Sequence, residues 1–167
     1  MAEKTIDFIA LGRVSSRAEF KSIRLAEVSA KCDPKVSGPL SARLENNCEV
    51  LGRDGNVLRV LCNYQFSVSV TEVQVAEATV KYLVEYELRG DEPFSDDDIS
   101  AFAFANGTLH SWPFLREFLN GLTSRMGYQP YMLPVFHFIP KRPPQPAPKA
   151  EPATVQELPE LSPEEPS

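Results

Sequence analysis

Residues 107–134, GTLHSWPFLREFLNGLTSRMGYQPYMLP, decide the fold. Ser111 and Pro113 predict where a helix begins, because serine caps a first turn and proline is tolerated within it. Gly127 and Pro130 predict where that helix ends. Apolar residues recur between them at steps of three and four, which places on one face Leu115, Phe118, Leu119, Leu122 and Met126. A helix this one-sided must bury its apolar face against the strand-rich region upstream.

That upstream region predicts an antiparallel sheet. Strands are expected at 22–33, 42–53, 57–71 and 77–88, and Asp54-Gly55 is a hairpin signal between the second and the third. In the last two strands apolar and polar residues alternate. The apolar positions are Val60, Cys62, Tyr64, Phe66, Val68, Val70, Ala78, Val80, Tyr82, Val84, Tyr86 and Leu88. One apolar face and one polar face are what a sheet covered on a single side requires.

A short helix is expected between the sheet and the main helix, from Ser95 to Gly107. Ser95 and Asp98 resemble a capping box, and the three acids at 96–98 favour the positive end of a helix. Three adjacent acids could instead hold a cation. Four strands followed by two helices predict an α+β fold, a four-stranded antiparallel sheet with both helices packed on one face.

Three parts are expected along the chain. Residues 1–17 form an N-terminal helical arm, which either docks on its own domain or ties subunits together. The short helix expected there, over residues 5–18, places on one face Ile6, Ile9, Ala10 and Val14. Residues 18–139 form the folded domain. Residues 140–167 hold most of the 15 prolines and no aromatic residue, and therefore predict a disordered Pro/Glu-rich tail, either solubilising or a docking peptide at 158–161, LPEL.

The composition argues against several classes of protein. A net charge of −6 and a pI near 5.0 disfavour a nucleic-acid-binding protein, which needs a basic face. The sequence has no apolar run that predicts a membrane span, and its start does not resemble a secretory signal. Cys32, Cys48 and Cys62 are interpreted as small buried hydrophobes of a reduced intracellular protein. We therefore expect a cytoplasmic location.

Patterns that predict catalysis or metal binding do not occur in the sequence. His110 and His137 have no Cys or His neighbour at metal-ligand spacing, and phosphate-binding and nucleophile motifs are missing. A Ser–His–Asp arrangement stays open, because its members meet only in space. We expect no enzyme activity, no cofactor and no metal.

The apolar side chains exceed what one sheet face can obviously cover. Phe104, Trp112 and Phe114 fall outside the main apolar stripes. This surplus predicts either a subunit interface or an apolar groove that binds other chains. Gly121 lies inside the helix at a cost of about 1 kcal/mol relative to alanine, which fits the close approach of another helix.

Residues 111–117, SWPFLRE, followed by 122–125, LTSR, then Pro130 and Leu133-Pro134, resemble the C-terminal signature of the SecB family of export chaperones. The resemblance covers about residues 17–138 and agrees with the order of four strands and two helices. The N-terminal helix and residues 89–93, RGDEP, look more like the SecB-like chaperones that accompany toxin–antitoxin systems. Residues 90–98 are shorter and more acidic than the family's glycine-rich crossover segment.

The resemblance implies an ATP-independent holdase that binds unfolded or nascent chains. Such proteins keep preproteins export-competent for the SecA motor, or guard an unstable antitoxin, and they assemble as homotetramers, dimers of dimers. An apolar client groove is then expected to be lined by Tyr82, Phe94, Phe104, Trp112 and Phe114. In the family, acids on the outer sheet face bind a basic tail of SecA, and here Glu85 and Glu87 are expected on that face.

Two other classes of function remain open from the sequence. One is a dedicated adaptor or assembly subunit that binds one specific folded partner. The other is a small-molecule site or an enzyme. Protection of unrelated unfolded proteins without ATP separates the first class from a holdase, and a metabolite or metal that co-purifies with the protein would favour the second.

Overall fold

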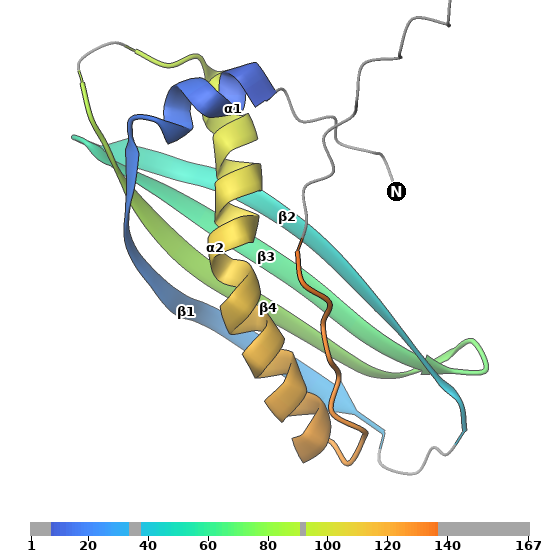
Figure 1. Cartoon of the computed structure of the whole chain (residues 1–167). Coiled ribbons are helices and arrows are strands. Elements are labelled where there is room, and N and C mark those ends of the chain that lie inside the picture. The colour runs from blue at the N-terminus through green and yellow to red at the C-terminus, as the bar shows by residue number, and fades with distance from the viewer. Residues whose placement is uncertain (1–7, 34–37, 91–92, 137–167) are drawn as a thin grey trace, which may run out of the picture. The chain divides into compact units, whose positions relative to one another are not determined.

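The computed structural model describes residues 8–33, 38–90 and 93–136. Its elements are α1 (Phe8–Ser15), β1 (Ala18–Cys32), β2 (Leu40–Asp54), β3 (Val57–Val70), β4 (Val73–Leu88) and α2 (Asp96–Arg125). The chain then runs back along α2 as a C-terminal segment (residues 127–136), drawn in orange in Figure 1. The predicted α+β class is confirmed. The expected tail at 140–167 lies outside the described residues.

All four strands form one antiparallel sheet in the order β1-β4-β3-β2. The Asp54-Gly55 signal is confirmed as the β2–β3 turn, where Gly55 has a φ of 57°. The next turn lies earlier than expected, because β4 begins at Val73 rather than at residue 77. Thr71 and Glu72 both adopt positive φ there, 48° and 69°. Neither threonine nor glutamate is typical of a turn with positive φ, so the sequence pattern did not predict the position of this turn.

The first strand keeps its apolar residues on one face by means of two bulges. Its register against β4 shifts between Phe20 and Ser22 and again between Leu25 and Glu27. Each shift inserts a residue and restores the alternation. Phe20, Leu25 and Val28 therefore pair with Tyr86, Tyr82 and Val80, and share their face of the sheet. Strict alternation of apolar and polar residues along β1 would not place these three residues on one face, so the sequence pattern did not reveal it.

The two helices expected after the sheet are one continuous helix of 30 residues, α2. The expected end at Gly107 and the expected start at Ser111 are therefore wrong. Gly107 is needed for packing, since a Cβ there would lie 2.7 Å from the Sγ of Cys62. Ser111 is buried and donates its hydroxyl to the carbonyl of Gly107. Figure 1 shows that the two halves of α2 run in different directions, as a proline such as Pro113 inside a helix leads one to expect.

The start of α2 was predicted correctly. Ser95 is its N-cap and accepts a hydrogen bond from the backbone N–H of Asp98. The carboxylate of Asp98 accepts a hydrogen bond from Arg13 of α1 at 2.8 Å. Hydrogen bonding with Ser95 and the charge of Arg13 lower the pKa of this carboxyl group. Val14 of α1 is fully buried in the core. Helix α1 thus docks on its own chain, while Ile6 lies outside the described residues.

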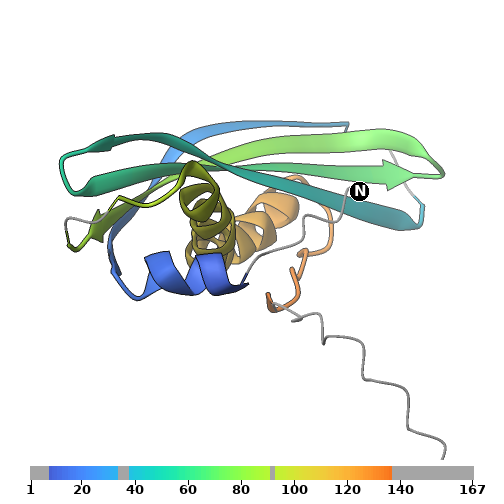
Figure 2. The same cartoon turned by 90° about the horizontal axis from the view of Figure 1, so that it is seen from above.

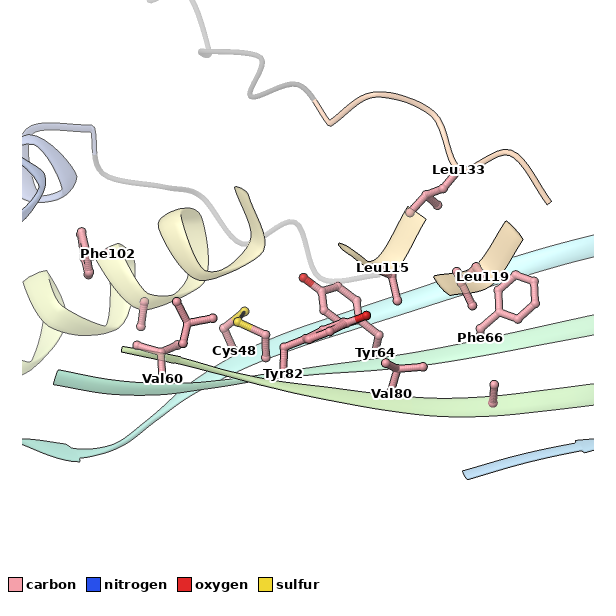
Figure 3. Packing of buried hydrophobic residues seen from close by; sticks show 14 of the residues in the cluster. Cys48, Val60, Tyr64, Phe66, Val80, Tyr82, Phe102, Leu115, Leu119 and Leu133 are labelled. Atoms are coloured by element: carbon pink, nitrogen blue, oxygen red, sulfur yellow. Dashed lines mark hydrogen bonds between the residues drawn. The ribbon is translucent and has the colours of Figure 1, made fainter. Parts of the chain in front are cut away.

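One face of the sheet carries the core, and α1, α2 and the C-terminal segment all lie on that face (Figure 2). The alternating apolar residues predicted for β3 and β4 are buried there. Figure 3 shows Tyr64 and Tyr82 rising from the sheet, with Leu115 and Leu119 of α2 facing it. Cys48 and Cys62 are buried as expected, whereas Cys32, at the end of edge strand β1, is exposed. None of the helices in the described part of the chain has the length and apolarity of a membrane span.

Candidate functional site: the two flanks of helix α2

Helix α2 is held on the sheet by buried hydroxyl groups as well as by apolar packing. Tyr64 and Ser111 share a hydrogen bond of 2.6 Å between their hydroxyl oxygens, and Asn46 donates to Thr108 at 3.1 Å. Burial raises the pKa of the Tyr64 phenol far above its ordinary value. These partners satisfy polar groups that would otherwise be buried without a hydrogen bond, and they set the position of the helix along β2 and β3.

A pocket of about 550 Å³ opens between α2 and the C-terminal segment. We call it the helix pocket. Trp112 and Leu109 stand on its helix side, and Phe136 faces Trp112 with a ring-centroid distance of 4.9 Å. Arg116, Glu117 and Asn120 add polar groups at the rim, and the remaining lining residues are Pro113, Met132 and Val135. Leu109, Met132 and Val135 are exposed, so apolar surface faces the open side of the pocket.

The far wall of the helix pocket is fixed by specific contacts. The indole N–H of Trp112 donates to the carbonyl of Pro134 at 2.8 Å, and the backbone N–H of Tyr131 donates to the hydroxyl of Thr123 at 2.8 Å. Leu133 is buried, and the ring of Tyr131 packs on that of Phe66 with centroids 5.0 Å apart. The pocket is therefore built before any ligand arrives, which lowers the entropic cost of binding.

The opposite side of α2 leaves apolar side chains exposed. Phe20, Leu25 and Val28 of β1 point to the covered face of the sheet, yet they are 43%, 50% and 41% exposed. Phe114 of α2 is 48% exposed beside them, with its ring 6.3 Å from that of Tyr82. We call these four residues and the free edge of β1 the β1 flank. β1 is an edge strand of the sheet, and Figure 1 shows its first half clear of α2.

His110 links α2 to the β1 flank. Its Nδ1 lies 2.8 Å from the hydroxyl of Tyr86, and its ring lies 5.0 Å from that of Phe20. Partial burial lowers the pKa of His110 below its ordinary value of 6.5. Burial thus favours the neutral imidazole, which serves as a hydrogen-bonding partner of Tyr86 at the edge of the core.

The five aromatic residues predicted for the client groove do not all meet. Tyr82 and Phe114 contact each other on the β1 flank, while Trp112 lines the helix pocket. Phe94 lies beneath the guanidinium of Arg17, whose Cζ is 4.4 Å from the ring centroid. Phe104 packs against the core, half-buried. Tyr82 is itself buried, which raises the pKa of its phenol to about 12.

The outer face of the sheet carries charged residues that pair with one another. Glu85 accepts from Ser22 and Arg59 at 2.9 and 3.2 Å, and Glu87 pairs with Lys21 at 2.8 Å. These contacts lower the pKa of both carboxyl groups. Both residues lie on the predicted face, but a basic partner would have to compete with these cations of the same sheet.

The sequence reasoning missed most residues of both surfaces. Met132, Val135 and Phe136 line the pocket because the chain folds back along α2. The apolar sequence of residues 131–139 predicts an extended segment, but not that it returns along the helix. Phe20, Leu25 and Val28 were not predicted to share a face, because the bulges of β1 interrupt the simple alternation along the strand. Among residues 8–33, 38–90 and 93–136, no group of three or more His, Cys, Asp or Glu side chains could hold a metal ion.

The fold is that of the SecB-like chaperones. The chain superposes on such a chaperone from Mycobacterium tuberculosis, solved in complex with a ChAD peptide from the HigA1 antitoxin, with a TM-score of 0.69 and 22% sequence identity over 77% of this chain and 97% of that one. A protein of unknown function from Streptococcus agalactiae gives a TM-score of 0.39 at 11% identity, over 70% of this chain and 96% of that one. No family model and no curated protein sequence matches the chain.

Proposed function

We propose that this protein is an ATP-independent chaperone that binds unfolded or nascent polypeptide segments in the helix pocket. The observation that carries the proposal is the pocket itself, an apolar concavity with an aromatic wall and a few polar groups, on a fold of the SecB type. A cavity of this size accepts the apolar side chains of an extended segment, while its rim can bind the main chain of that segment.

The binding mechanism that we propose is passive. Apolar side chains of the client displace water from Leu109, Met132 and Val135, at about 25 cal/mol per Å² of apolar surface buried. Arg116, Glu117 and Asn120 offer donors and acceptors to the client backbone. Each contact is weak, so a long client gains affinity by occupying pockets on several subunits at once.

The β1 flank is the surface that we assign to subunit association. Its four apolar residues are 41–50% exposed, and β1 is an edge strand that a second strand can extend. Two copies related by a twofold axis would bury Phe20, Leu25 and Val28 against each other. A homotetramer built as a dimer of dimers would then present several helix pockets.

The client that we favour is an antitoxin or another chain that is unstable on its own. The Mycobacterium tuberculosis chaperone binds a peptide of an antitoxin, and this chain spans nearly the whole of that protein. Delivery of preproteins to the SecA motor from a cytoplasmic location is the second client pathway in this proposal. Glu85 and Glu87 are the residues that we would test for contact with a basic tail of SecA.

Suppression of aggregation tests the proposal. Full-length protein is added without ATP to a chemically unfolded, unrelated protein, and light scattering is followed after dilution. We expect the wild type to suppress scattering and L109S/V135S, which removes apolar surface from the helix pocket, to have lost most of that activity. The matched control is L51S/V73S, because Leu51 and Val73 are also more than half exposed, at 55% and 65%, but lie outside the pocket.

Three outcomes separate the hypotheses. Equal suppression by both double variants would overturn the assignment of the pocket. No suppression by the wild type, combined with protection of one specific folded partner, would favour a dedicated adaptor. A metabolite or metal that co-purifies in stoichiometric amount would favour a small-molecule site.

A further inference from the structure

Two cysteines lie side by side beneath the middle of α2. Cys48 of β2 and Cys62 of β3 are directly opposite each other in the sheet, and their Sγ atoms are 2.9 Å apart. A disulfide bond is about 2.05 Å long and requires Cα atoms about 4.4–6.8 Å apart, a range that directly paired antiparallel residues satisfy. The two sulfur atoms can therefore form a bond with little movement of the backbone.

The helix above the pair leaves room for the two sulfur atoms. A Cβ at Gly107 would lie 2.7 Å from the Sγ of Cys62 and 3.3 Å from that of Cys48, so any larger residue would displace them. The hydroxyl of Thr108 lies 3.4 Å from the Sγ of Cys48. A glycine at the contact point and a polar neighbour define a small site around the thiols, within an otherwise apolar core.

We propose that Cys48 and Cys62 form a reversible disulfide, which links edge strand β2 to β3 when the protein meets a small-molecule disulfide, RSSR. The Cys48 thiol gives up its proton and attacks one sulfur of RSSR, releasing the first RS⁻ and leaving a mixed disulfide. The Cys62 thiol then loses its proton and attacks the sulfur of Cys48, releasing the second RS⁻. Two cysteine thiols are oxidised, and one RSSR is reduced to two RSH, which take up the two protons.

Cys48 is the first nucleophile because it lies on the edge strand and is 7% exposed, whereas Cys62 is fully buried in a central strand. The neighbouring Cys48 and burial raise the pKa of the Cys62 thiol well above its ordinary value. The Cys62 thiolate is therefore scarce while α2 covers the pair, and closure of the disulfide follows transient opening of the helix or takes place during folding. Cys32 is exposed at the end of β1 and reacts independently.

The test uses the full chain with C32S, which removes the exposed thiol. One sample of native protein is incubated with oxidised glutathione, and a second is refolded from denaturant in the same reagent. Intact mass, thiol titration after unfolding and a non-reducing peptide map are recorded. We expect the loss of both thiols, a mass lower by about 2 Da, a peptide cross-linked between the two cysteines, and a melting temperature higher by about 5–10 °C.

The double variants C32S/C48S and C32S/C62S, each with a single remaining cysteine, are the controls. Each retains one core thiol, which is expected to stay free or to carry one glutathione, without the rise in melting temperature. If the refolded C32S protein keeps both thiols, or carries glutathione on each cysteine, the proposal is wrong. If the disulfide forms during refolding but not in the native sample, the pair is oxidised only while the protein folds, and the bond itself is upheld.

Discussion

The two flanks of α2 start from similar side chains and become different surfaces. On the side of β2 the chain folds back, and Tyr131, Leu133 and Pro134 are tied to the helix or packed against the sheet. This return produces a concave pocket with fixed walls. On the side of β1 no such return of the chain occurs among the described residues, and Phe20 and Leu25 stay 43% and 50% exposed beside an open strand edge.

This difference shows that apolar surplus alone does not define a binding site. What matters is whether a second segment provides a wall. A pre-built pocket can take single side chains from many sequences, whereas exposed apolar side chains beside a free strand edge suit a large complementary surface, such as a second copy of the same chain. This contrast is the reason why we propose client binding at the first flank and association at the second.

The largest effects on stability are expected when a leucine is replaced by alanine, once at a buried position and once on the β1 flank. L58A removes a fully buried leucine of β3 and should lower the free energy of unfolding by about 2–5 kcal/mol at every protein concentration. L25A, half exposed on the same face, should change stability chiefly through association, so its unfolding midpoint should depend on concentration differently from that of the wild type. Denaturant titrations at several protein concentrations would check both. A loss for L25A that is as large as that of L58A at all concentrations contradicts the comparison.

Two glycines of α2 provide a second contrast. G107A places a methyl group 2.7 Å from the Sγ of Cys62, and this overpacking should lower the free energy of unfolding by about 1–3 kcal/mol. The higher helix propensity of alanine offsets part of that loss. G121A meets only the mobile guanidinium of Arg125, so it should stabilise an isolated subunit by up to about 1 kcal/mol. Thermal unfolding measures both. If G121A instead weakens assembly, the close helix contact predicted for Gly121 lies between subunits.

The wall of the helix pocket is expected to depend on one indole hydrogen bond. W112F keeps most of the apolar surface but loses the bond to the carbonyl of Pro134, which should cost about 0.5–1.5 kcal/mol. Hydrogen exchange of residues 131–136 should become faster in this variant, while exchange in β1 stays unchanged. Unchanged exchange at 131–136 would mean that Leu133 and Tyr131 alone hold the wall in place.

The smallest effect should be a pH dependence confined to the β1 flank. Burial lowers the pKa of His110 in the folded state, so the unfolded state binds the proton more readily. The neutral imidazole contributes fully to the stability of the folded state above the pKa of His110 in the unfolded chain, near 6.5. This contribution is lost as pH falls through and below that value. Subtracting the stability curve of H110Q should isolate this loss between about pH 7 and 5 from the carboxyl titrations of Glu85 and Glu87. A flat difference curve would contradict it.

Much of the fold could be predicted from the sequence because β3 and β4 alternate cleanly and Asp54-Gly55 is an unambiguous turn signal. The junction between the helices was mispredicted because Gly107 and Ser111 look like a helix end and a cap, when they serve contacts with Cys62 and Tyr64 instead. Tertiary packing decided their roles, and local propensity does not contain it. Of the five aromatic residues predicted for the client groove only Trp112 lines the helix pocket, and Met132, Val135 and Phe136 reach the pocket through the return of the chain.

Hydrogen exchange of the full-length protein, with and without a bound unfolded client, tests the central claim most directly. We predict new protection of backbone amides in the C-terminal segment and around residues 109–120 of α2, with little change on the outer face of β3 and β4. Protection restricted to the strands, with none beside the helix pocket, would contradict the assignment of client binding to this flank of α2.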